Sequence, residues 1–153
     1  MSAEARLRDK HITLPSPTTP LANYVGAVRV GNLLFLSGHG PFHEGKATAR
    51  GTLGKDLTTE EGYKVAREVG LNLLATTRTA LGSLDKVKRV VKVLGMVRSA
   101  AGFGDQPKVI NGFSDLMVEV FGETIGKHAR SAVGMAELPM GIPVEIEMIL
   151  EVE

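Results

Sequence analysis

Two segments near the C-terminus carry side chains suited to acid–base chemistry on a charged small molecule. Arg130 begins an apolar run, and its planar guanidinium can hold a carboxylate through two hydrogen bonds. Glu145 and Glu147 alternate with apolar residues, so both should lie on one face of a strand. If that face is covered, at least one carboxylate pairs with an arginine or has a raised pKa. The alternative is a surface arginine paired with an acid, and two exposed carboxylates without a role.

Other chemical motifs are weak or missing. His39 and His43 stand four residues apart in a glycine-rich stretch, a spacing that by itself is poor evidence for a metal site, and we expect no metal. Asp56 follows Gly54-Lys55 where a phosphate-binding loop needs Ser or Thr. The absence of cysteine excludes thiol nucleophiles, thiolate zinc sites and iron–sulfur clusters.

The composition indicates one soluble domain over residues 1–153. The chain has 153 residues, 43% of them hydrophobic, which is enough to bury a core and too apolar for disorder. Its 18 basic and 17 acidic residues give a net charge of +1, so we expect no attraction to nucleic acid or anionic lipid. Because the sequence has neither a membrane-spanning apolar run nor a secretory pattern, we expect a cytoplasmic protein.

Turn signals and hydrophobic periods place the elements. Gly31-Asn32 between two apolar runs predicts a hairpin over 24–38. A capping box of Thr58 and Glu61 begins a helix at Thr59, and Gly82 ends it after Leu81. We further expect an N-terminal arm over 1–22 and a loop with some irregular strand over 38–55. Strands should span 87–97, 131–137 and 144–152, and a helix capped by Asp105 should span 107–121.

The order β-β-α-β-α-β-β predicts an α+β two-layer sandwich, a mixed sheet with both helices on one face. Leu34, Leu36, Val91 and Val93 cannot all face the helices if their neighbours do so as well. The helix-free face would then expose an apolar patch, and we expect an oligomer in which these faces pack together. The alternative is a barrel-like curvature that hides this surface within one chain.

Two segments resemble the RidA family, also called YjgF or endoribonuclease L-PSP. One is YVGAVRVGNLLFLSGHGP over 24–41, and the other is ARSAVGMAELPMGIPVEIE over 129–147. With the helices between them, the resemblance extends over 20–152. It implies a chorismate-mutase-like fold, a homotrimer with ligand clefts between subunits, and hydrolysis of reactive enamines and imines to 2-oxo acids and ammonia without a cofactor.

The resemblance also implies roles for individual residues. Arg130 matches the arginine that grips the carboxylate of a small ligand, and Glu145 matches the carboxylate that positions or activates water. The side chains of Tyr24, Ser37 and Asn111 match residues that line the cleft. The backbone of Ala132 would also face the ligand.

The chain departs from the family pattern around this cleft. His39 and Gly40 replace a frequent Gln and apolar residue, which makes His39 a further candidate for substrate binding and specificity. His128 replaces a frequent Pro, and the loop over 42–55 is glycine-rich. Because of these departures, the alternative function is the binding of 2-oxo acids by a non-catalytic trimer. RNA cleavage or a chorismate-mutase reaction has less support, because the net charge is small and a fold does not fix a function.

Overall fold

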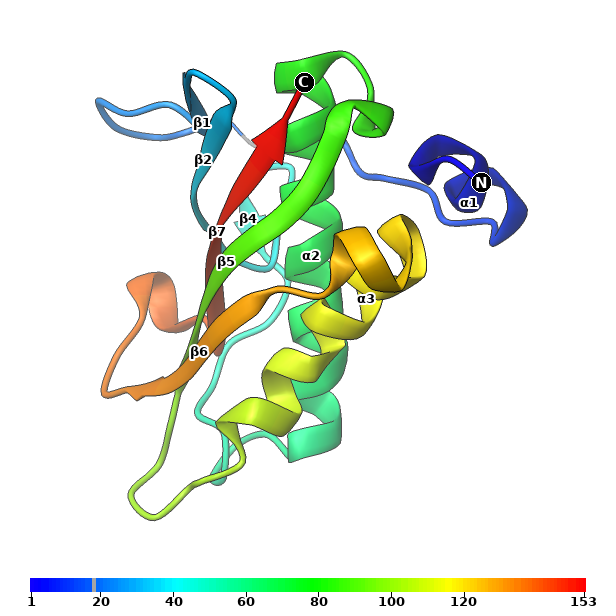
Figure 1. The fold of residues 1–153 in the computed structure, drawn as a ribbon. Helices are drawn as coiled ribbons and strands as arrows, with labels where there is room; N and C mark the ends of the chain where they lie inside the picture. The colour runs from blue at the N-terminus through cyan, green and yellow to red at the C-terminus, as the bar shows by residue number, and fades with distance from the viewer. Residues whose placement is uncertain (18) are drawn as a thin grey trace.

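A five-stranded mixed sheet with strand order β1-β2-β7-β5-β6 forms one layer of the protein (Figure 1). This computed structural model describes residues 1–17 and 19–153. The strands are β1 Ala27–Val30, β2 Leu33–His39, β5 Val87–Arg98, β6 Ala129–Met135 and β7 Val144–Val152. Only β5 and β6 pair in parallel, because helix α3 (Gln106–Gly126) connects them; the other neighbours are antiparallel. The predicted α+β class and mixed sheet are confirmed, although β6 begins two residues earlier than expected.

The first hairpin turns at Gly31, whose φ of +58° is a conformation that glycine adopts without strain. The glycine-rich stretch after it contains a second, very short hairpin of β3 (Phe42–His43) and β4 (Lys46–Ala47). This arrangement agrees with the expected loop and its irregular strand.

Helix α2 spans Thr59–Leu81, as predicted. The Thr58 hydroxyl accepts a hydrogen bond from the N–H of Glu61, and the Glu61 carboxylate accepts one from the N–H of Thr58. These two bonds satisfy amides that the first helical turn leaves free. Gly82 ends the helix in the left-handed conformation at φ +85°.

Helix α3 differs from its prediction at both ends. The Asp105 side chain caps no backbone amide, so that part of the prediction is wrong. Its carboxylate instead accepts a hydrogen bond from the Thr59 hydroxyl at 3.4 Å. Gly122 is non-helical, with φ +82° and ψ 170°, so a short helical turn follows the predicted end at Phe121. None of the helices in the described part of the chain combines the length and apolarity needed to cross a membrane.

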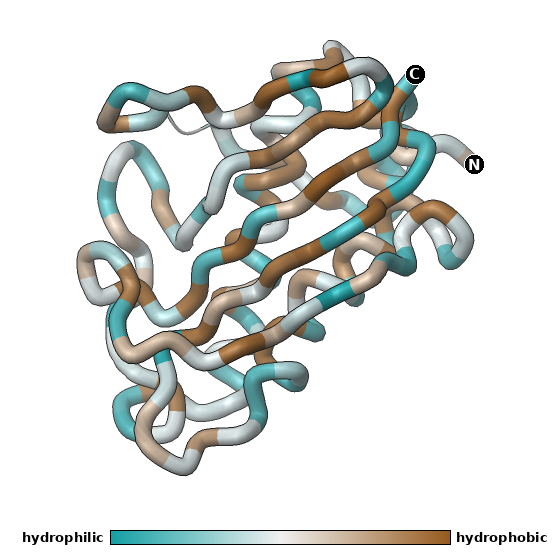
Figure 2. The backbone as a smooth tube through the Cα atoms, turned by 60° about the vertical axis from the view of Figure 1, so that its left-hand side comes forward, coloured by the Kyte–Doolittle hydropathy of each residue, from teal (hydrophilic) through white to brown (hydrophobic). Residues whose placement is uncertain are grey.

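Both long helices cover the same face of the sheet (Figure 1). In Figure 2 the backbone of the sheet alternates between hydrophobic and hydrophilic residues, and the apolar set of β7 is fully buried: Val144, Ile146, Met148, Leu150 and Val152. Close packing between α2 and α3 depends on Gly112. A Cβ at this position would lie 2.0 Å from the carbonyl oxygen of Tyr63, so any side chain would push the two helices apart.

Apolar residues lie on both faces of the sheet, as the sequence predicts. Leu34, Leu36 and Val93 are buried on the helix side, and only Val91 of the four points away from it, with 37% exposure. Val91 and Val93 point to opposite faces although they are two residues apart, because the β5–β7 register is irregular between Val90 and Lys92 and a bulge resets the alternation of side chains. The large apolar residues exposed on the helix-free face are Val28, Val30, Phe35, Val91 and Val133.

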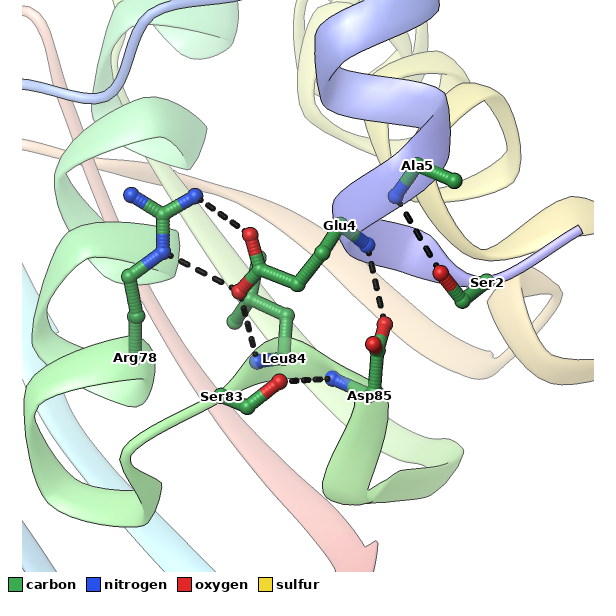
Figure 3. A network of polar contacts seen from close by, with 7 residues as sticks. All are labelled: Ser2, Glu4, Ala5, Arg78, Ser83, Leu84 and Asp85. Atoms are coloured by element: carbon green, nitrogen blue, oxygen red, sulfur yellow. Dashed lines mark hydrogen bonds and ion pairs between the residues drawn. The ribbon is translucent and has the colours of Figure 1, made fainter.

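The predicted N-terminal arm is wrong in its first part, because Ala3–Asp9 form helix α1, which packs against α3 and the short 3-10 helix η1 (Leu84–Lys86). Figure 3 shows the contacts that hold it. The Glu4 carboxylate accepts hydrogen bonds from the Arg78 guanidinium at 2.7 and 3.1 Å and from the Leu84 N–H at 3.0 Å. Burial raises the pKa of Glu4, but the hydrogen bonds from Arg78 and Leu84 outweigh it, so the pKa lies below its ordinary value.

Candidate functional site

Arg130 lies on the edge strand β6 and extends over the helix-covered face to α3. Its Nη1 donates to the Asn111 Oδ1 at 2.8 Å and to the Ser114 Oγ at 3.1 Å. No acid among residues 1–17 and 19–153 lies within ion-pair distance of the guanidinium. Neutral acceptors therefore orient this half-buried cation, and its charge is not compensated, which is the state that suits an anionic ligand. The alternative of a surface arginine paired with an acid does not apply.

The connection β5–α3–β6 brings these residues together. Asn111 and Ser114 are three residues apart on α3, which places them on the same side of the helix. Ala132 follows Arg130 by two residues on β6, so it lies on the same face of the sheet, and it packs against the core. Asn111 and Ala132 were predicted, whereas Ser114 was not. Ser114 could have been identified from the sequence, because Asn111 and Ser114 are polar residues at helical spacing beside an apolar face.

Glu145 lies on the helix-free side of β7 and lines a pocket of about 500 Å³. Burial, and after it the neighbouring Glu147, raise the pKa of Glu145 above its ordinary value. The carboxyl group lies against the backbone of β2: a Cβ added at Gly38 would be 2.8 Å from Glu145 Oε2. Gly38 therefore leaves the space that this carboxylate occupies. Apolar side chains of Phe42 and Ile142 line other parts of the pocket.

Of the residues predicted beside Glu145, Tyr24 lines the same pocket and is 54% exposed. Ser37 is not among the lining residues, because its hydroxyl donates a hydrogen bond to the Val25 carbonyl at 2.6 Å. That bond ties the end of β2 to the segment that carries Tyr24. The contribution of Ser37 is therefore to the shape of the pocket wall.

His39 lines the pocket but is only 6% exposed, and both ring nitrogens have partners within the chain. Nδ1 lies 2.6 Å from the Ser37 carbonyl and Nε2 lies 2.8 Å from the Thr76 hydroxyl on α2. Burial lowers the pKa of His39 and outweighs the bond to Ser37, which favours the neutral ring. His39 thus fastens β2 to α2. The described residues contain no group of three or more side chains arranged to hold a metal ion.

The sheet separates Arg130 from Glu145 within one chain. Arg130 pairs with Val93 of β5, and Val93 pairs with Met148 of β7, three residues away from Glu145. Strand spacings place the two residues about 10 Å apart across the sheet and about 10 Å apart along it. Their side chains also point to opposite faces, because Arg130 reaches α3 and Glu145 points away from the helices. One chain therefore presents two separate groups of predicted site residues.

The YjgF/chorismate-mutase-like family model matches residues 4–147. The protein belongs to this family, which includes the RidA proteins, and it has their chorismate-mutase-like α+β fold. The predicted family and fold class are therefore confirmed.

Individual relatives cover almost the whole chain. "Protein TCP17" of Trypanosoma cruzi is 44% identical over 147 residues, which is 96% of this chain and 92% of the relative. A 2-iminobutanoate/2-iminopropanoate deaminase of Dermatophagoides farinae is 33% identical over 147 residues, covering 93% and 95% of the two chains. The crystal structure of Atu1372 from Agrobacterium tumefaciens, a protein of unknown function, superposes with a TM-score of 0.90 at 42% identity, covering 99% of this chain and 92% of that one.

Proposed function

We propose that the protein hydrolyses 2-imino acids and their enamine tautomers to 2-oxo acids and ammonia, at sites between the subunits of a homotrimer. The observation that carries the proposal is the uncompensated charge of Arg130, which neutral side chains of α3 hold in place. A second line of support is the relative from Dermatophagoides farinae, which is named a deaminase of such imines.

The separation of Arg130 and Glu145 supports an assembly with sites between subunits. A site that needs both is completed when the β6 edge of one subunit meets the Glu145 pocket of the next. The β6 edge and the Glu145 pocket are different surfaces, and each subunit has one of each. Such head-to-tail contacts form a closed ring when the rotation between neighbouring subunits closes. Three subunits are the number that the family resemblance implies. The exposed apolar residues Val28, Phe35 and Val133 would be covered by neighbouring subunits in the same assembly.

The chemistry assigns one task to each group. Arg130 binds the substrate carboxylate and thereby aligns the imine carbon with a water molecule. Water adds to this carbon as the C=N electron pair moves to nitrogen, and Glu145 accepts the proton that the water loses. Glu145 returns this proton to the nitrogen, which gives a carbinolamine. It then moves the proton of the new hydroxyl group to the same nitrogen, the C–N bond breaks, and ammonia leaves as the C=O bond forms. The raised pKa of Glu145 suits a group that both accepts and donates a proton.

The first experiment measures turnover. A dehydratase generates 2-aminoacrylate, and the release of pyruvate is followed with and without the protein. We expect acceleration by the wild type, loss of at least about a hundredfold in kcat/KM for Arg130→Ala, and no change for Arg8→Ala, an exposed arginine on α1. Arg130-dependent binding of pyruvate without turnover would instead support the non-catalytic trimer. An unchanged rate in Arg130→Ala would refute the proposal.

The second experiment tests the shared site. Arg130→Ala and Glu145→Ala subunits are each expected to be inactive. When the two are unfolded, mixed in equal amounts and refolded, about a quarter of the interfaces should combine an intact Arg130 with an intact Glu145 and regain activity. Mixtures that stay inactive, although sedimentation shows particles of three times the 16.3-kDa chain mass, would exclude a site shared between subunits.

A further inference from the structure

The Arg130 cluster continues beyond its direct contacts to His128. Ser114 Oγ, which accepts from Arg130 Nη1 at 3.1 Å, also lies 2.9 Å from His128 Nε2. On the other side of the ring, Nδ1 lies 2.7 Å from the carbonyl oxygen of Gly126. Three consecutive contacts therefore connect the end of α3 to the guanidinium: Gly126 to His128, His128 to Ser114, and Ser114 to Arg130.

The chemistry of these groups fixes the direction of each hydrogen bond. A carbonyl oxygen only accepts, so His128 Nδ1 must carry a hydrogen. Burial lowers the pKa of His128, and the adjacent charge of Arg130 lowers it further, which outweighs the bond to Gly126 and favours the neutral ring. In the neutral ring Nε2 is then an acceptor, and the Ser114 hydroxyl must donate to it. The lone pairs of Ser114 remain for the N–H of Arg130.

We infer that His128 is a positioning residue for Arg130, acting through Ser114. The inference rests on the proposed function in one respect, namely that Arg130 binds the substrate carboxylate. Without an acceptor at the position of Nε2, the Ser114 hydroxyl is free to rotate and to turn its hydrogen toward Arg130. The guanidinium would then lose one of its two short contacts and keep only Asn111 on that nitrogen.

The packing of the imidazole supports a fixed geometry. The ring meets Phe113 edge-on, with ring centroids 5.9 Å apart and planes inclined by 69°. This contact is typical of a favourable aromatic arrangement and restrains the ring plane. His128 stands directly before the first residue of β6 and two residues before Arg130, which keeps the path through Ser114 short. In place of the proline frequent in the family, this chain thus carries a residue that contacts the arginine through a serine.

Kinetics provide the first test. His128→Leu keeps apolar contact with Phe113 and removes the acceptor, whereas His128→Gln places an amide oxygen where it can accept from Ser114. We expect KM for the imine and Kd for pyruvate to rise about tenfold in His128→Leu and Ser114→Ala, as for the loss of one charge-assisted hydrogen bond, with kcat within about twofold of the wild type. His128→Gln should restore both values to within about threefold. Equal losses in the Leu and Gln variants would overturn the inference.

Nuclear magnetic resonance provides a test that needs no activity. At pH 7 the ¹⁵N shifts should show a neutral His128 with hydrogen on Nδ1. The Nη hydrogens of Arg130 should give separate signals in the wild type and in His128→Gln, because rotation is restricted, and averaged signals in His128→Leu and Ser114→Ala. A hydrogen on Nε2, or separate signals in all four proteins, would overturn the positioning role even in an active enzyme. A wild type that neither turns over imines nor binds pyruvate would refute the proposed function, while the Arg130 signals still decide the role of His128.

Discussion

Replacing Gly38 by alanine offers a sharp test of Glu145, because it moves the carboxylate without changing its chemistry. The new Cβ would lie 2.8 Å from Oε2 and 3.1 Å from Cδ of Glu145. Both distances are shorter than ordinary contacts, so the carboxyl group must shift by several tenths of an ångström. A misplacement of about 1 Å in a catalytic group costs about a hundredfold in rate, so we expect kcat to fall about tenfold or more.

The fold should tolerate this substitution. Gly38 has no positive φ, and alanine in a strand gains about 0.5–1 kcal/mol over glycine, which offsets part of the strain. The matched control is Gly104→Ala, where a Cβ meets nothing within 4 Å and φ is also not positive. The assay is the imine hydrolysis described above, combined with thermal unfolding of both variants. If Gly38→Ala keeps the kcat of Gly104→Ala, the position of Glu145 does not control the reaction, and its assigned role is wrong.

Three further predictions concern stability. Glu4→Ala should lower the unfolding free energy by about 2 kcal/mol, or Tm by about 4–8 °C, through loss of the bonds from Arg78 and Leu84; an unchanged Tm would contradict this role. Gly112→Ala should cost more than about 3 kcal/mol in chemical denaturation, because its Cβ meets backbone; a loss below 1 kcal/mol would show that the helices can separate. Because the pKa of Glu145 in the folded protein is raised above 4.5, ionisation of this carboxyl group destabilises the fold as pH rises through that pKa. The Tm of Glu145→Gln should therefore exceed that of the wild type at pH 7.5 and approach it at pH 4. A Tm difference that is the same at both pH values would argue against the raised pKa.

Local signals explain why some elements could be predicted to the residue. The bounds of α2 are marked by the capping box at Thr58 and by Gly82, and both act within one helical turn. Helix α1 has a single local signal, the Ser2 hydroxyl that accepts from the Ala5 N–H, and the helix is short. Its main anchor, the pair of Glu4 and Arg78, joins residues 74 positions apart. The bulges in β5 were likewise invisible, because they are defined by the register with β7.

In the candidate site, the residue types could be predicted from the sequence, whereas their arrangement in space could not. Motif resemblance identified Arg130, Asn111 and Glu145 as residue types at given positions. Their placement on opposite faces of the sheet depends on the pairing of β6 with β5, which no local pattern encodes. The link from Ser114 to His128 also depends on where the end of α3 meets β6, and so it could be found only in the structure.

The central position of β7 has a consequence for how the chain folds during synthesis. The last strand to be made pairs with both β2 and β5, whereas β5, α3 and β6 form a unit from residues close in sequence. Local contacts form early and distant ones late, so this unit can assemble before β7 exists. Until then, β2 and β5 each present a strand edge without its final partner, and such edges are templates for aggregation. A pause in translation before residue 144 would therefore expose two aggregation-prone edges in the nascent protein.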